Sequence, residues 1–246
     1  MNATSASRAE PLAPRSARPA GQRVLVWDAP VRVFHWLTVL SFAGAYLTAE
    51  SERWRLLHVT LGYTLAGLVV FRVFWGLLGT RHARFSSFVR GPAAVMRYVR
   101  SLLSGEPDHH TGHNPAGALA IVAMLMAALA VAASGYASLE SPWGEWVKEL
   151  HEVVANGMVL LVGVHVAAVL VASRMHGENL VRAMVTGHKR GQPHEATARA
   201  FKGVAVIMLV AVLGFWWTQW QAAPAAAPGA GHGEAASLLD HDEDDD

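Results

Sequence analysis

Apolar residues are gathered in five long blocks along the chain, and each block is long enough to predict a membrane-spanning helix. The blocks cover about Val31–Leu47, Leu56–Leu78, Pro115–Ala137, Trp146–Ala172 and Val204–Trp220. A helix needs about 20 predominantly apolar residues to cross the hydrocarbon layer of a bilayer. Asp28 and Pro30 stand in the order of a helix cap and a first-turn proline, which predicts the start of the first helix. The pattern therefore predicts an all-α membrane protein.

The two ends of the chain lack such blocks. Residues 1–23 are rich in Ala, Ser, Pro and Arg and contain no apolar core of a signal peptide, so we expect a disordered basic tail. Residues 222–246 are rich in Ala, Pro and Gly and end in HDEDDD, so we expect a disordered acidic tail. Between them we expect a main transmembrane domain over residues 24–200 and an additional helix over 201–221.

Composition narrows the possible chemistry. Hydrophobic residues make up 52% of the chain and charged residues only 16%, whereas a soluble domain carries about a quarter. The chain has no Cys. This excludes disulfides, Cys-ligated iron–sulfur clusters, thiolate zinc sites and covalent haem attachment through C-x-x-C-H.

Basic residues gather on one side of the membrane if all five blocks cross it. The N-terminal arm through Arg32 and the segments 79–114 and 173–203 then share a side and hold 16 of the 20 Lys and Arg residues. The positive-inside rule places this side, and the N-terminus, in the cytoplasm and the acidic C-terminus outside, as expected for a multi-pass protein of the bacterial inner membrane.

The fourth block, Trp146–Ala172, carries two histidines, His151 and His165. Fourteen residues at about 100° each fall about 40° short of four turns, so both imidazoles lie on one face of a helix, about 21 Å apart along its axis. His35 lies near the start of the first block and His58 near the start of the second. The predicted topology therefore pairs His58 with His151 on the outer side and His35 with His165 on the inner side.

Each histidine pair joins two helices at one depth, which is what bis-imidazole ligation of a haem iron requires. Without Cys, non-covalently bound b-type haem is the expected ligand. A single histidine within a membrane is as readily a structural residue or a proton relay as a ligand. Two other functions therefore stay open: a proton or divalent-metal transporter that uses the same histidines as relays, and a redox-silent membrane anchor.

Several segments together resemble the bacterial cytochrome b561 family, most closely the branch of the b-type cytochrome subunits of nickel–iron hydrogenases. The segments are VWDAPVRVFHW, LHVTLGY, GHNPAG, ELHEVVANGMVLLVGVHVAAVL and HGENLVRAMVTGHKR, within about residues 24–190. The resemblance implies a four-helix transmembrane di-haem bundle. It also implies that the axial ligands are His35, His58, His151 and His165. A fifth C-terminal transmembrane helix is a departure from the minimal four-helix members.

The resemblance also implies a function and its partners. We expect electrons to pass between the quinone pool and an external redox partner, either a hydrogenase-like complex or a periplasmic electron-transfer protein such as a cytochrome c. The remaining partner is the lipid bilayer, and no nucleic-acid partner is expected. Direct enzymatic activity as a quinone-linked oxidoreductase is left open. Two histidine ligands per iron leave no open coordination position for oxygen.

Further residues have two possible roles. Arg72 follows His58 by 14 residues and shares its helix face, so it could pair with a propionate of the inner haem or extend to the membrane surface. Six glycines could leave room for a flat macrocycle or serve close helix packing: Gly44, Gly62, Gly67, Gly76, Gly157 and Gly163.

Histidines outside the blocks are weaker candidates. His109, His110 and His113 precede Pro115 and could form a metal site, but loop histidines at such a place are more often solvated. The same holds for His232 and His241 in the tail.

Overall fold

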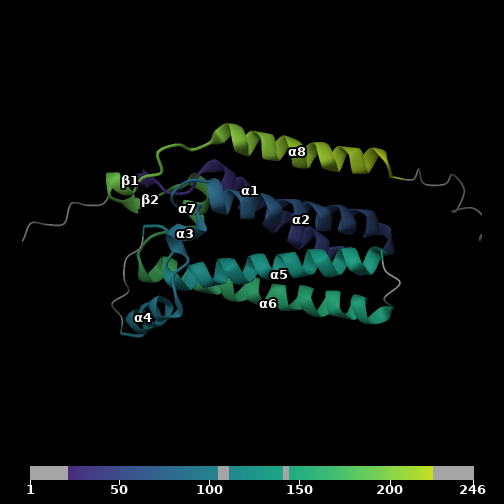
Figure 1. The fold of residues 1–246 in the computed structure, drawn as a ribbon, viewed down its shortest axis with the longest axis horizontal. Helices are drawn as coiled ribbons and strands as arrows, with labels where there is room; N and C mark the ends of the chain where they lie inside the picture. The colour runs from purple at the N-terminus through teal and green to yellow at the C-terminus, as the bar shows by residue number, and fades with distance from the viewer. Residues whose placement is uncertain (1–21, 105–110, 141–143, 224–246) are drawn as a thin grey trace, which may run out of the picture.

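The five predicted helices form an elongated bundle with a folded cap at one end (Figure 1). A computed structural model describes residues 22–104, 111–140 and 144–223 of the 246-residue chain. The predicted disordered tails therefore lie almost wholly outside the described residues. Strand β1 begins at Gln22, two residues inside the stretch predicted as the basic tail.

Long helices account for every predicted apolar block. They are α1 (Ala29–Leu47), α2 (Arg55–Leu78), α5 (Pro115–Glu140), α6 (Glu145–Met175) and α8 (Lys202–Gln221). Within the described residues, four stretches are long and apolar enough to cross a membrane: Glu52–Leu78, Pro115–Leu139, Glu145–Met175 and Lys202–Gln221. The first of them includes the short 3-10 helix η1 (Glu52–Trp54) before α2. The prediction of an all-α membrane protein is confirmed, although α1 is not among these four stretches, because polar residues such as Arg32 and His35 make it less apolar.

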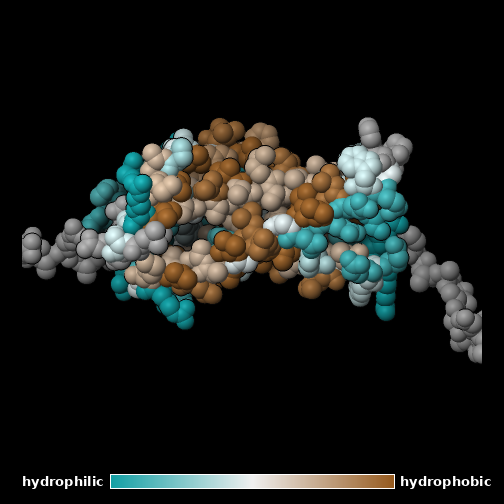
Figure 2. Space-filling view, turned by 90° about the horizontal axis from the view of Figure 1, so that it is seen from below, coloured by the Kyte–Doolittle hydropathy of each residue, from teal (hydrophilic) through white to brown (hydrophobic). Residues whose placement is uncertain are grey.

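Two helical hairpins make the bundle. Helix α1 packs against α2, α5 packs against α6, and α2 joins the two hairpins by packing against α5. Their common core consists of Leu65, Val69, Ala128, Val131 and Met158. The outer faces are apolar as well, and Figure 2 shows this as a broad hydrophobic surface between two polar ends. Lipid tails are as apolar as leucine, so close van der Waals packing rather than exclusion of water holds such helices together.

Helix α8 packs on the outside of this bundle, on α1 (Figure 1). Met208 of α8 lies in a cluster with Leu37 and Leu68. Farther along, the indole Nε1 of Trp216 donates a hydrogen bond of 2.9 Å to Oγ1 of Thr64 on α2. The extra C-terminal helix is therefore attached to the bundle of its own chain.

The cap is built from short elements that the sequence pattern did not predict. It comprises β1 (Gln22–Leu25), α3 (Phe85–Phe88), α4 (Pro92–Leu103), α7 (Leu180–Thr186), β2 (His188–Gly191) and η2 (Pro193–Glu195). The two strands pair antiparallel, with Gln22 opposite Gly191 and Leu25 opposite His188. Gly187 ends α7 at a φ of +83°, and a Cβ there would lie 2.7 Å from the Trp27 carbonyl oxygen. The tight turn from α7 into β2 therefore requires glycine.

Asp28 links the N-terminal end of α1 to the C-terminal end of α2 through hydrogen bonds. Its carboxylate accepts the backbone N–H of Val31 at 2.8 Å, which confirms the predicted helix cap. The same carboxylate accepts Nε1–H of Trp75 at 3.0 Å and the hydroxyl of Thr80 at 2.7 Å. Asp28 is 1% exposed, so all three bonds are shielded from water. A buried carboxylate is stable only with such a set of donors.

Candidate functional site

The structure brings the four predicted histidines together in two pairs at the two ends of the bundle. His58 at the start of α2 and His151 near the start of α6 form the distal pair, far from the cap, with ring centroids 6.2 Å apart and ring planes at 87°. His35 near the start of α1 and His165 of α6 form the cap-side pair and lie close enough to interact electrostatically. The contact between His58 and His151 agrees with the pairing predicted from depth, and ligation of a metal by the four histidines stays a prediction.

Both rings of the distal pair are held through the same nitrogen. Nδ1 of His58 lies 2.8 Å from the Ala45 carbonyl oxygen of α1. Nδ1 of His151 lies 3.1 Å from Oγ of Ser134 on α5. Ser134 Oγ also lies 2.7 Å from the Ala130 carbonyl oxygen, which holds the hydroxyl in place. Both histidine contacts are made at Nδ1, so Nε2 is the nitrogen of each ring that is available to a metal, as in metal-ligating histidines.

The spacing of the distal rings fits two axial ligands on one metal ion. A metal–imidazole bond is about 2 Å long, and about 1 Å more separates the nitrogen from the ring centroid, so two axial rings stand about 6 Å apart. The observed separation of 6.2 Å agrees with this value. The donor set, two neutral imidazoles without thiolate, suits a non-covalently held haem iron.

Gly135 leaves room for the ring of His151. A Cβ built at Gly135 would lie 3.0 Å from Cε1 and 3.3 Å from Nδ1 of that ring. Neither Ser134 nor Gly135 was predicted from the sequence. The sequence did contain one signal. Ser134 is a small hydroxyl residue near the end of the third apolar block, and His151 lies near the start of the fourth, so the two residues have a similar depth.

Gly135→Val is expected to displace the His151 ring and weaken haem retention by about tenfold, the lower end of what loss of an outer-shell partner costs a metal site. Haem content per chain after dilution in detergent measures the effect. Gly214→Val on α8 is the matched control, because nothing lies within 4 Å of a Cβ at that glycine. Equal haem loss in both variants would exclude a specific role for Gly135.

Six buried side-chain atoms have no hydrogen-bond partner among the described residues, and one of them belongs to the cap-side pair. They are Arg32 Nε, His35 Nδ1, Thr38 Oγ1, Ser41 Oγ, Arg72 Nη1 and His113 Nδ1. Buried polar groups are nearly always paired, and each orphan costs stability. His35, Thr38 and Ser41 follow one another at three-residue steps along α1, so their unpaired atoms lie on neighbouring turns of one helix face. This observation supports a cofactor at the cap-side pair as well.

Arg72 lies inside the bundle, near the cap end of α2. It is 3% exposed, so its side chain does not extend to the membrane surface. Its guanidinium carbon lies 4.8 Å from the centroid of the Phe85 ring of α3, which is cation–π distance. Asp28 lies close enough to attract it. One donor nitrogen, Nη1, is left without a partner, and such a donor suits a carboxylate.

His113 is half-buried, whereas the sequence suggested a solvated loop residue. Its ring packs on Trp27 at 4.4 Å and on Phe88 at 4.6 Å between centroids. Burial, followed by the positive charge of Arg72, lowers the pKa of His113 from 6.5 to about 3. His113 is therefore neutral at physiological pH. The described residues hold no cluster of three metal-binding side chains, and His109, His110, His232 and His241 lie outside them.

Two of the six glycines serve close packing: Gly44 lies against Leu61 and Gly76 against the ring of Phe85. A Cβ would meet nothing within 4 Å at the other four, which are Gly62, Gly67, Gly157 and Gly163. All of these except Gly62 are exposed, so the space beside them belongs to the outer surface of the bundle. Figure 2 shows a recess in the apolar surface toward the cap.

Comparison with known proteins identifies a family. The sequence model of the prokaryotic cytochrome b561 family matches residues 26–187. A probable Ni/Fe-hydrogenase B-type cytochrome subunit of Rhodobacter capsulatus is 25% identical over 215 residues, which cover 68% of this chain and 81% of the relative. A protein of the same description in Azotobacter vinelandii is 31% identical over 142 residues, which cover 46% of this chain and 58% of the relative. A probable Ni/Fe-hydrogenase 1 B-type cytochrome subunit of Escherichia coli K12 is 26% identical over 138 residues, with the same coverages. No solved structure matches.

The matched region contains both histidine pairs, Asp28, Arg72 and Ser134 and ends before α8. Membership in this family implies b-type haem. The chain belongs to the prokaryotic cytochrome b561 family.

Proposed function

We propose that this protein is a membrane-bound di-haem b-type cytochrome that carries electrons across the inner membrane. One haem b would be held by His58 and His151 and the other by His35 and His165. The observation that carries the proposal is the distal pair, whose spacing of 6.2 Å and Nδ1 contacts match two axial ligands of one iron. The unpaired Nδ1 of His35 and the unpaired hydroxyls of Thr38 and Ser41 on the same helix support the second site.

The residues of the chain position the cofactors and exclude water. A haem iron supplies reversible one-electron chemistry when bound. The contacts of Nδ1 of His58 with the Ala45 carbonyl and of Nδ1 of His151 with Ser134 would orient each ring toward the iron. The buried Arg72 provides a positive charge for a propionate near the cap. Two histidines on each iron would leave no position for oxygen, which would suit electron transfer rather than oxygen chemistry.

The two ends of the bundle would then serve different partners. The cap contains Arg81, Arg84, Arg90, Arg97 and Arg100, so the positive-inside rule puts it in the cytoplasm, together with the N-terminus. The distal pair would face the periplasm and exchange electrons with a hydrogenase-like complex, as the names of the relatives suggest, or with a cytochrome c. The quinone pool would be the partner inside the membrane.

A reduced-minus-oxidised absorption spectrum with a pyridine haemochrome assay tests the proposal. The purified full-length protein is expected to show b-type haem at two per chain, in two redox steps. Folded, detergent-stable protein that takes up no haem when haem is supplied in excess would exclude the cytochrome function. That result would favour the proton or divalent-metal transporter instead.

Arg72→Leu is expected to lower the reduction potential of the cap-side haem by about 60 mV, which is a tenfold change in a one-electron equilibrium. Removing a nearby positive charge makes reduction less favourable, since the reduced haem carries one positive charge less. Arg72→Lys keeps the charge and should restore part of the potential. A spectroscopic redox titration that resolves the two haems measures the shift. An unchanged cap-side potential with full haem content would contradict a propionate contact by Arg72.

A further inference from the structure

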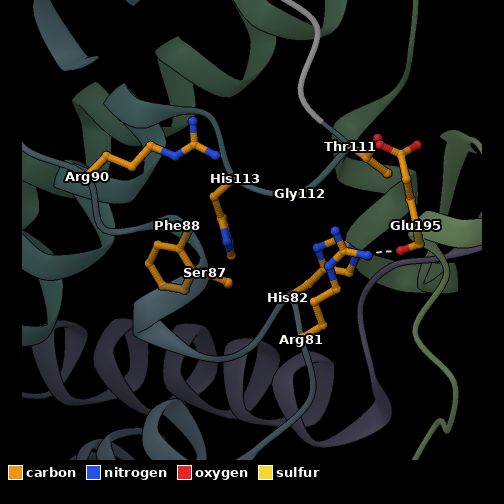
Figure 3. A pocket seen from close by; sticks show the side chains of 9 residues that line it. All are labelled: Arg81, His82, Ser87, Phe88, Arg90, Thr111, Gly112, His113 and Glu195. Carbon is orange, nitrogen blue, oxygen red and sulfur yellow. Dashed lines mark hydrogen bonds between the residues drawn. The ribbon is translucent and has the colours of Figure 1, made fainter.

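A cavity of about 220 Å³ opens in the cap beside the start of α5. Figure 3 shows Arg90 on one side of it and Arg81 with His82 on the other. Phe88 and His113 lie between these two sides. The cavity is thus polar at both walls and aromatic at its base, and neither histidine pair lines it.

The balance of charge in this cavity is positive. Arg81 and Arg90 line it with one positive charge each, and Glu195 is the only carboxylate among its lining residues. Glu195 accepts the backbone N–H of Gln192 at 2.8 Å, and this bond, followed by one from the Thr111 hydroxyl, lowers its pKa. Glu195 is therefore ionised, and the three charges sum to about +1, so the cavity favours an anion.

The donors in the cavity also suit a phosphate. A guanidinium has five N–H donors in a planar fork, and Arg81 uses one of them on the His194 carbonyl at 3.1 Å. Arg90 is exposed and reaches the cavity from the opposite wall. Two guanidiniums from opposite walls can hold several oxygens of one tetrahedral anion.

The surface next to the cavity is apolar. Helix α4 begins two residues after Arg90 and packs against α5. Met96 is 55% exposed, and Val99, three residues on, is exposed on the same side. Arg97 and Arg100 occupy a neighbouring strip of α4. A helix with an exposed apolar edge beside a basic edge is suited to lie at the boundary between headgroups and acyl chains.

We propose that this cavity binds the phosphate headgroup of an anionic phospholipid whose acyl chains lie along the apolar edge of α4. The basic cavity favours an anionic headgroup, and the exposed Met96 and Val99 favour contact with an acyl chain. A free inorganic anion could contact the cavity but would leave these two apolar side chains uncovered. Basic pockets beside membrane helices on the cytoplasmic side bind such headgroups. The proposal does not depend on whether the histidine pairs hold haem.

The test uses full-length protein in nanodiscs of phosphatidylcholine, with and without phosphatidylglycerol. The anionic lipid is expected to raise the melting temperature of the wild-type protein. In native mass spectrometry, Arg90→Gln should bind phosphatidylglycerol about fivefold more weakly, the contribution of one guanidinium near an anionic surface. Arg174→Gln at the end of α6 is the matched control, because Arg174 is equally exposed but does not line the cavity, and it should bind as the wild type does.

Two results would overturn the proposal. Equal lipid binding by the Arg90→Gln variant, the control variant and the wild type would mean that only the general positive charge of the cap attracts lipid. Equal stabilisation by inorganic phosphate in phosphatidylcholine discs would mean that the cavity binds a soluble anion without a lipid tail. A selective loss in the Arg90→Gln variant, without an effect of phosphate, would establish the lipid site.

Discussion

The His58→Ala variant is expected to contain one haem per chain instead of two. His58 and His151 stand on different helices with ring centroids 6.2 Å apart, so removal of either ring leaves the other without a partner across the metal. The cap-side pair uses other residues and should keep its haem. Pyridine haemochrome quantification against protein concentration measures the ratio directly.

Double variants make this expectation sharper. His58→Ala combined with His151→Ala should still contain one haem, because both changes affect the same site. His58→Ala combined with His35→Ala should contain none. His194→Ala is the matched control, since His194 is an exposed histidine of the cap, and it should keep two haems. A His58→Ala/His151→Ala variant that contains no haem would contradict separate sites.

Asp28→Ala is expected to cause the largest loss of stability, about 3 kcal/mol in the free energy of unfolding. Removal of a helix cap costs about 1 kcal/mol. The change also leaves the indole N–H of Trp75 and the hydroxyl of Thr80 without an acceptor, and each buried orphan costs about 1–3 kcal/mol. Urea unfolding in detergent, followed by circular dichroism, measures the change.

Two further variants separate the bonds of Asp28 from a general effect of charge. Asp28→Asn keeps one acceptor oxygen and should lose less stability than Asp28→Ala. Glu152→Ala removes an exposed carboxylate beside the distal pair and should change stability by less than about 0.5 kcal/mol. If Asp28→Ala lowered the free energy of unfolding no more than Glu152→Ala does, the hydrogen bonds of Asp28 between α1 and α2 would not contribute to stability.

The helices and the histidine pairing follow from local pattern. Apolar blocks predict where a helix can cross lipid, and the predicted block Leu56–Leu78 differs from α2 by one residue. The pairing follows from depth alone, since each helix crosses the layer once and the sequence position of a histidine then sets its side. The helix cap at Asp28 is equally local, and it too was predicted.

The cap and the contacts of the ligands could not be predicted in this way. Strands β1 and β2 have four residues each and lie more than 160 positions apart, so no local pattern links them. Ser134 contacts His151 because α5 is rotated about its axis so that this residue faces α6. The apolar composition of the two helices does not specify that rotation. The burial of His113 likewise depends on Trp27 and Phe88 from distant segments.

The pairing of β1 with β2 has a consequence for the order of assembly. Strand β1 precedes the first long helix and β2 follows α6, so the ladder between them can form only after four long helices have been made. During synthesis Gln22–Leu25 must therefore stay unpaired until His188–Gly191 leaves the ribosome. Contacts this far apart in sequence form late, because the loop between them must close first. The two-stranded sheet therefore forms after α1, α2, α5 and α6 have been synthesised, and α8 is added to the bundle last.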